Sequence, residues 1–577
     1  MKSLYLSVLG ITIPCAFALT GCTDDDYDLS DLDKTAQIPV NDLTVPVNID
    51  EIYLSDIIDV KPGDRVQIVD GGYAVVEENT FNSDPIEVDD VTLSSPMLES
   101  STRNISLDGA ATLLESGQPL LLPLGSDESA YDLTASDVSA YIVSVKEVDC
   151  DLKITIALSL NGFGDKLKSM SLRNVVLGIP KGLGNVTGNG RYSAESGEFH
   201  VTDSRINGTK AEIEIAAKKL DFIKCGAVYN ADAHTMKFAD KLKVISGEAV
   251  ITASDFTTTD FSTLPSYCTY RTDFDLSRVY ITGFSGRIRY DLTSFDIPQV
   301  DLTDLPDVLS QPGTDIKLVN PCLYLRIENP VSAYSLHAVT GFEIKALREG
   351  QPTQSYSLPA PFTVTSEPES EYCLSPTKPS EYLTAFANSQ HIPFPSLGNI
   401  FSGDGLPQSL DINLINPELP EQEVTGFKLG HKLGSVHGSY YFFAPIELGA
   451  GSKITYSDVL DGWSSEDLDK VTISRLHVTA SVTTDVPVSL KFSAYPIDKD
   501  GNQINDVEID GGYVDASAID QQLDINITGT VTGLAGIRFT AVAAPKPGED
   551  ASALRPGMNI KLSKIRATVS GYYLTTL

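Results

Sequence analysis

Side chains that could do chemistry are numerous in this sequence, but few stand at the spacing that a catalytic or metal site requires. The histidines are His200, His234, His337, His391, His431, His437 and His477. Only His431 and His437 lie near each other, and their even separation would put them on one face of a strand, without the third ligand that zinc needs. The motifs H-E-x-x-H and G-x-S-x-G and the Walker A loop do not occur. Any two of the 78 carboxylates could still meet as a glycosidase pair, and the sequence does not say which. We therefore expect no catalysis, no cofactor and no metal.

Two further segments resemble ligand loops only in part. Asp498-Lys499-Asp500-Gly501 begins like a calcium loop, but its glycine is at the fourth position and Ile509 stands where a bidentate glutamate should be. This excludes an EF-hand and predicts an acidic hairpin, with a calcium site among Asp498, Asp500, Asp506 and Asp510 as the alternative. The Gly-rich residues 182–190 are followed by a turn-rich β pattern, not by the helix that a phosphate-binding loop needs, and so predict a loop or hairpin.

The cysteines after residue 22 do not form a recognisable framework. They are Cys150, Cys225, Cys268, Cys322 and Cys373, and no pair has C-x-x-C spacing. Cys150 shares its strand parity with Leu152 and Ile154, which predicts a small buried apolar residue. Five cysteines allow at most two disulfides, and none at all is the alternative.

The N-terminus begins with a single base and a short apolar run. Lys2 precedes the apolar residues 4–18, which are too few for a permanent spanning helix but suit a secretory signal. The run ends at Leu19-Thr20-Gly21-Cys22, which resembles the lipobox of bacterial lipoproteins. That resemblance implies a signal peptide over residues 1–21, cleavage before Cys22 and acylation of this cysteine. An uncleaved signal anchor is the alternative, and no later apolar run approaches the ~18 residues of a spanning helix.

An acidic block follows Cys22 directly. Asp24, Asp25, Asp26 and Asp28 are four of six aspartates within residues 23–33. Such a block repels itself and buries nothing, so residues 22–40 are predicted to be a disordered tether. It also resembles the acidic export signal of surface lipoproteins of the Bacteroidota, which implies a lipid anchor in the outer membrane and a chain that faces the cell exterior. A linker on a periplasm-facing lipoprotein is the alternative.

The elements that must carry these residues are strands. Val486, Val488, Leu490, Phe492 and Ala494 alternate with polar residues, and residues 152–160 and 564–570 show the same period of two. Helical signals are short, around residues 306–309 and 380–386. With 577 residues, of which 42% are apolar, the chain is long enough for about three to five domains. The pattern predicts a mostly β protein.

Short sequence segments recur along the chain and suggest related modules. Ile327-Glu328-Asn329-Pro330 is followed by Val339-Thr340-Gly341-Phe342, and Ile415-Asn416-Pro417 by Val424-Thr425-Gly426-Phe427. A strand that ends in Asn-Pro and returns as an alternating strand resembles the immunoglobulin-like sandwich of late-embryogenesis-abundant proteins, and convergent strand-and-turn sequence is the alternative. We expect several antiparallel, immunoglobulin-like β-sandwich modules in tandem behind the lipidated tether. The predicted modules are an N-terminal one at 41–100, one or more at 101–297, one at 298–407 and one or more at 408–577.

Partners are indicated only by class. The formal net charge of −36 repels phosphate backbones, so we expect no nucleic-acid partner. Trp463, the only tryptophan, lies in a polar, turn-like stretch and is the candidate for stacking on a sugar. The leading interpretation is a non-catalytic, surface-exposed lipoprotein acting in adhesion, envelope structure or partner binding, of which a fimbrial subunit is a variant. A glycan-binding lipoprotein of a polysaccharide-uptake system is the alternative, and an envelope hydrolase comes third.

Overall fold

The computed structural model describes residues 35–46, 51–276, 278–292, 295–403, 405–460, 471–505 and 507–576. Strands make up most of the regular structure, and the longest of the described helices is α2 (Ala110–Glu115). The sheets are antiparallel, apart from one parallel pair formed by β28 (Glu369–Ser375) and β29 (Gln390–Pro393). The prediction of a mostly β protein built from antiparallel sandwich modules is therefore confirmed. None of the described helices is long and apolar enough to cross a membrane.

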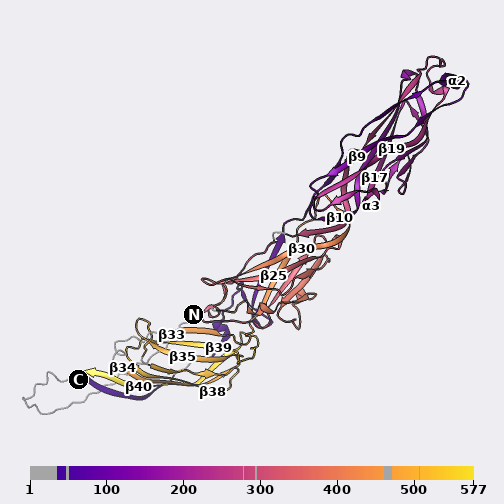
Figure 1. Cartoon of the computed structure of the whole chain (residues 1–577). Helices are drawn as coiled ribbons and strands as arrows, with labels where there is room; N and C mark the ends of the chain where they lie inside the picture. The colour runs from indigo at the N-terminus through magenta and orange to yellow at the C-terminus, as the bar shows by residue number, and fades with distance from the viewer. Residues whose placement is uncertain are drawn as a thin grey trace, which may run out of the picture.

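The molecule is elongated, with three modules in a row (Figure 1). The distal module lies at the end marked by α2. It also contains α3 (Phe222–Cys225), β6 (Val91–Ser94), β7 (Ser101–Ser106), β8 (Leu120–Leu124), β9 (Asp127–Ala135), β10 (Ile142–Asn161), β11 (Ser169–Gly178), β12 (Leu183–Gly184), β13 (Thr187–Gly188), β14 (Gly190–Ser193), β15 (Glu198–Val201), β16 (Ser204–Asn207), β17 (Lys210–Asp221), β18 (Val228–Asn230), β19 (Thr235–Ile251), β20 (Tyr267–Asp275) and β21 (Arg278–Asp291).

The middle module is built from segments on both sides of the distal module in the sequence. Besides β28 and β29, it contains α1 (Leu54–Ile57), β3 (Val66–Val69), β4 (Gly72–Ser83), β5 (Glu87–Val88), β22 (Phe295–Asp296), β23 (Val300–Asp301), α4 (Asp307–Ser310), β24 (Cys322–Glu328), β25 (Ala338–Leu347), β26 (Gln354–Ser357), β27 (Phe362–Val364), β30 (Ser409–Lys428), β31 (His431–Lys432) and β32 (His437–Pro445).

The terminal module lies at the opposite end from α2 (Figure 1). It combines β1 (Thr35–Pro46) and the short β2 (Ile52–Tyr53) with β33 (Ile454–Leu460), β34 (Val471–Thr484), β35 (Ser489–Ile497), β36 (Val507–Asp510), β37 (Tyr513–Val514), β38 (Gln521–Val531), β39 (Gly536–Ala544) and β40 (Asn559–Thr576), the strand with which β2 pairs. One sheet has the order β1-β40-β34-β38-β36, and the other has the order β33-β39-β35-β37.

The chain therefore runs out to the distal module and back. β1 pairs antiparallel with β40 from Thr35 opposite Thr576 to Pro46 opposite Arg566. β4 then pairs with β32 in the middle module, and β6 pairs with β21 in the distal one. Residues 41–100, which the sequence predicts to be one N-terminal module, thus contribute strands to three different regions. Strand pairing joins segments that are hundreds of residues apart, which the local alternation does not encode.

The side-chain alternation that the sequence predicts is present in the strands. In β10, Leu152, Ile154 and Ile156 are buried, whereas Lys153 is exposed. β9 alternates buried and exposed residues along its whole length. Successive side chains of a strand point to opposite faces, so each of these strands turns one apolar face to a core.

Two large hydrophobic cores divide the molecule. One is formed mainly by the distal module, and includes Leu133, Ile154 and Phe238. The other runs without a break from the middle module, where it includes Phe342 and Phe394, into the terminal module, where it includes Val482, Leu490 and Val514. The terminal and middle modules thus share one core, and the distal core reaches into the middle module through residues such as Val88 and Leu419.

Candidate functional site

The residues predicted to act as anchor, export signal and sugar-stacking platform lie outside the described residues. They are Cys22, Asp24, Asp25, Asp26, Asp28 and Trp463. Their roles therefore stay predictions. The strands nearest to them in sequence are β1, which begins at Thr35, and β33 and β34, which end at Leu460 and begin at Val471.

The near pair of histidines is divided between two strands. His431 lies in β31, opposite Val88 of β5, whereas His437 lies in β32 and its Nδ1 is 2.6 Å from Oδ1 of Asn82. Among the described residues, no group of three or more His, Cys, Asp or Glu side chains is arranged to hold a metal ion.

The acidic segment that begins at Asp498 forms the expected turn. The Asp498 carboxylate accepts hydrogen bonds from the backbone N–H groups of Asp500 and Asn502, at 2.9 Å each. The hydrogen bond from the Asn502 backbone N–H makes the largest contribution to lowering the pKa of Asp498. Asp506, one member of the alternative calcium set, lies outside the described residues.

The Gly-rich segment is part of the sheet and has a packing role. It contains the short strands β12, β13 and β14, and β14 forms a hairpin with β15. A Cβ atom at Gly190 would lie 2.4 Å from the His200 carbonyl oxygen and 2.5 Å from the Phe199 ring. Glycine is needed here because the backbone passes directly against its neighbours.

All five cysteines in the described part of the chain are free and buried. Cys150 is buried in the distal core, as its strand parity predicts. Cys322 and Cys373 lie on the paired strands β24 and β28, in a small cluster with Tyr324 and Phe386. The Cys322 thiol donates to the Asn320 carbonyl oxygen at 3.6 Å and the Cys373 thiol to Oγ of Ser375 at 4.0 Å, and the interaction with Cys322 lowers the pKa of the Cys373 thiol.

A polar groove on the outer face of the distal module is the strongest candidate site among the described residues. Its volume is about 440 Å³. It is lined by Asp151, Leu152, Lys153, Thr155, Ala216, Ala217, Lys218, Asp275, Arg278 and Tyr280, which come from β10, β17, β20 and β21. This volume is within the range of small-molecule sites, roughly 300 to 1,000 Å³.

The strand register explains why the surface is hollow here. β10 pairs with β20 as far as Thr155 opposite Asp275, and with β21 from Leu152 opposite Val279, so this ladder breaks between the two strands. On the other side, Ala216 of β17 lies opposite Lys153. A methyl group therefore stands where the surrounding positions carry long side chains, and these form the walls.

The walls carry charges of both signs. The Lys218 ammonium is bonded to the Asp151 carboxylate, and Nζ of Lys153 lies 2.7 Å from Oε1 of Glu214. The bond to Glu214 raises the pKa of Lys153. Arg278 is exposed and makes no ion pair with any other described residue, and the Tyr280 side chain is 48% exposed. The groove therefore offers one uncommitted guanidinium beside an accessible aromatic ring.

This groove was not predicted from the sequence. Its residues are ordinary members of the polar faces of four strands, and only the tertiary pairing brings them together. The weak signal that could have indicated it is Ala216, a small residue on a polar face where Glu212, Glu214 and Lys218 are its neighbours at the same parity.

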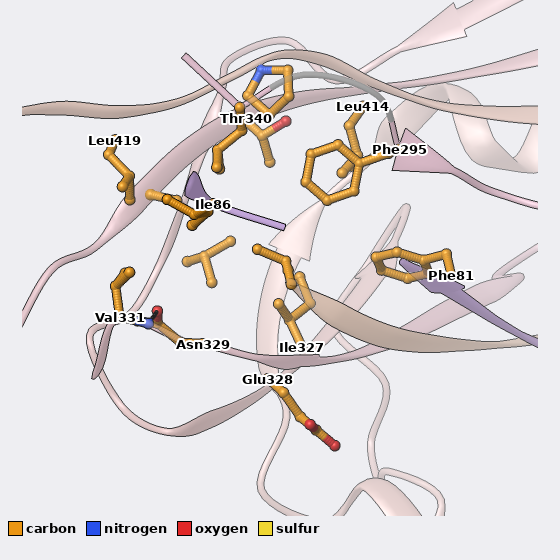
Figure 2. A pocket seen from close by; sticks show the side chains of 15 residues that line it. Phe81, Ile86, Phe295, Ile327, Glu328, Asn329, Val331, Thr340, Leu414 and Leu419 are labelled. Atoms are coloured by element: carbon orange, nitrogen blue, oxygen red, sulfur yellow. Dashed lines mark hydrogen bonds between the residues drawn. The ribbon is translucent and has the colours of Figure 1, made fainter. Parts of the chain in front are cut away.

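A second, apolar cavity lies between the sheets of the middle module (Figure 2). Its volume is about 40 Å³, and Phe81, Ile86, Phe295, Leu414 and Leu419 are among its lining residues. Figure 2 shows these side chains converging on a shared space, with the Glu328 carboxylate directed away from it. Asn329, the polar amide at its rim, donates to the carbonyl oxygens of Leu336 and Thr365 and accepts from Val331 N–H. With its amide satisfied and its walls apolar, this cavity is a gap in the packing where the middle and distal cores meet.

Comparisons with known proteins yield remote likenesses. No family model matches the chain, and no curated protein matches it. A crystal structure from Parabacteroides distasonis, of a protein described as secreted, is 12% identical and covers 50% of this chain and 89% of its own, with a TM-score of 0.34. The structure of Broad Bean Stain Virus is 9% identical and covers 51% of this chain and 90% of its own, with a TM-score of 0.13. Structural likenesses this remote do not indicate a function, so function is inferred from the chain's own residues and geometry.

Proposed function

We propose that this protein is a non-catalytic lipoprotein on the exterior of the outer membrane, and that it holds a ligand-binding module away from the membrane. The observation that carries the proposal is the route of the chain out to the distal module and back (Figure 1). β1 begins 35 − 22 = 13 residues after Cys22 and belongs to the terminal module. Acyl chains on Cys22 would therefore keep the terminal module within about 45 Å of the lipid surface, at the ~3.3–3.6 Å that one extended residue spans.

The far end of the molecule would then face the surroundings of the cell. An elongated body anchored at its terminal module presents the distal module, with its polar groove, farthest from the membrane. More than one acyl chain on Cys22 would make the attachment stable, because a single chain binds membranes only weakly. Adhesion, envelope structure and partner binding all remain within this proposal.

The anchor and the export signal are tested separately. Cys22→Ala is expected to abolish incorporation of labelled palmitate and to release the protein from the membrane fraction. Replacing Asp24, Asp25, Asp26 and Asp28 with Ala should leave acylation intact and remove surface display, measured by protease shaving of whole cells. Asp232→Ala, an exposed site on a turn of the distal module, is the matched control. Equal shaving of the four-Asp variant and the wild type would contradict the export role of the acidic block.

The polar groove favours a second, more specific candidate, a glycan-binding lipoprotein of a polysaccharide-uptake system. Its exposed tyrosine and its charged side chains are the kinds of group that hold sugars. A glycan array probed with the chain from Thr23 onward, which contains every described residue, distinguishes this function from adhesion to a protein. The same glycans, incubated and analysed for shortened products, test the envelope hydrolase.

A further inference from the structure

The polar groove of the distal module gathers cations and anions at one place on a strongly acidic protein. Its lining has three cations, Lys153, Lys218 and Arg278, and two anions, Asp151 and Asp275, so its formal charge is 3 − 2 = +1. The whole chain has a formal charge of −36. Glu214, which is bonded to Lys153, and Glu212, which also acts on Lys153, lie just outside the lining and within the Debye length of about 8 Å at physiological ionic strength, so they offset this charge.

The three cations are not equally available to a ligand. Lys153 is bonded to Glu214, and Lys218 is bonded to Asp151. Arg278 makes no ion pair with any other described residue. Its planar guanidinium can bind a carboxylate through two parallel hydrogen bonds. The groove therefore contains a single free site for an anionic group.

The other walls suit hydroxyl groups and a sugar ring. Tyr280, two residues along β21 from Arg278 and on the same face, has its side chain 48% exposed and offers an aromatic surface. Asp275 lies opposite Thr155, and both can hydrogen-bond to hydroxyl groups. The small side chain of Ala216 leaves room above the sheet for a ring.

The geometry points to the groove as a binding site for a carboxylate-bearing saccharide, a uronic acid within a glycan chain. Arg278 holds the carboxylate, Tyr280 packs against a face of the sugar ring, and Asp275 accepts hydrogen bonds from its hydroxyl groups. The groove lies at the surface of the module, so the rest of a longer glycan can extend beyond it. This inference rests on the proposed ligand-binding role of the distal module and names its ligand class.

The test uses the chain from Thr23 onward and isothermal titration with trigalacturonate, and with the uncharged trisaccharide of galactose as the comparison. The wild type is expected to bind the acidic sugar in preference to the neutral one, more weakly as NaCl rises from 50 to 500 mM. Arg278→Gln should weaken binding of trigalacturonate by about tenfold or more, as the loss of a charge-assisted pair predicts. Tyr280→Ala should weaken binding of both sugars.

Two controls and one gain-of-binding variant sharpen the result. Arg191→Gln, an exposed arginine of β14, and Tyr267→Ala, a tyrosine 54% exposed at the start of β20, should leave binding unchanged. Glu214→Gln frees Lys153 and should strengthen binding of trigalacturonate. Matching melting temperatures show that each variant is folded.

Three outcomes of the sugar titrations would overturn the inference, and a fourth comes from sulfate. They are no binding of either sugar, equal binding of the acidic and neutral sugars, and equal effects of Arg278→Gln and Arg191→Gln. Binding of inorganic sulfate as tightly as trigalacturonate would also overturn it, because the site would then recognise charge without the sugar. Since this chain carries no lipid, a failure here leaves the proposed anchoring untouched, and a failure of anchoring leaves this result untouched.

Discussion

Asp255 is a buried carboxylate that ties together three segments of the distal module. It is 2% exposed and accepts hydrogen bonds from Oγ of Ser169 at 2.6 Å, from the Thr252 N–H at 2.8 Å and from Nη2 of Arg205 at 2.5 Å. Burial by itself would raise the pKa of Asp255, but the hydrogen bonds from Ser169 and Thr252 and the charge of Arg205 together lower it. The folded state thus favours the ionised form.

Asp255→Asn is expected to destabilise the distal module at neutral pH. A folded-state pKa below the unfolded value means that the stabilisation is present above about pH 4, the unfolded pKa of Asp, and is lost as pH falls through the lowered folded pKa. We expect a loss of about 1–3 kcal/mol in the free energy of unfolding at pH 7, by the cost of a lost hydrogen bond to a charged group. Urea denaturation at pH 7 and pH 3 measures it, with the exposed Asp232→Asn as control. An equal loss at both pH values would contradict this account.

The thiols of the buried cysteines should be unreactive in the folded protein. Burial raises the pKa of Cys150 to about 12 and those of Cys225 and Cys268 to about 11, so their reactive thiolate forms are scarce at neutral pH. We expect a maleimide reagent to label these three only after denaturation. Melting temperatures with and without reductant should agree within about two degrees, since large modules need no disulfides. A drop of about ten degrees on reduction would instead mean that Cys322 and Cys373, which lie on paired strands, are joined.

At the scale of elements, β40 holds the terminal module together. It lies between β1 and β34 in its sheet, and its N-terminal end also pairs with β2. Ile565 packs against the core that the middle and terminal modules share. The strand predicted from the alternation of residues 564–570 is therefore an interior strand, paired within its own chain.

Truncation after Pro556 should unfold the terminal module. It removes β40, and with it the strand partners of β1, β2 and one side of β34. The distal module has its own core and should keep its fold, which limited proteolysis and mass spectrometry of the protected fragment can measure. If the truncated chain stays fully folded, or if full-length protein forms concentration-dependent chains that truncation abolishes, β40 instead serves to join subunits.

At the scale of the whole molecule, the two cores predict two unfolding units. Phe238 is fully buried in the distal core, and Phe394 is fully buried in the core shared by the middle and terminal modules. Phe→Ala in a core costs about 3–5 kcal/mol. Calorimetry should therefore resolve two transitions, with Phe238→Ala lowering one and Phe394→Ala lowering the other. A single transition shifted by both variants would mean that the cores unfold together across their contact.

The type of each element and the direction in which its side chains face can be predicted from the sequence alone. The alternation in residues 152–160 predicts a strand with Leu152, Ile154 and Ile156 inside, and the structure has them there. The turn that begins at Asp498 is likewise predicted by its sequence and present in the structure. Both follow from local physics, because side chains of any strand alternate between its faces and short polar side chains favour turns by bonding to the nearby backbone.

Which strands lie together, in contrast, depends on contacts between segments that are far apart in the sequence. β1 and β40 stand at opposite ends of the described chain, yet they are adjacent, and a hydrogen bond joins Asp42 N–H to Oγ of Ser570. Any strand with alternating apolar and polar residues can pair with any other such strand, so the alternation does not determine the partner. The partner is determined by how well the side chains on the two strands' faces pack together. The polar groove depends on the same choice. Ala216, Asp275 and Arg278 are unremarkable in the sequence, and they form a site only because β17, β20 and β21 meet at β10.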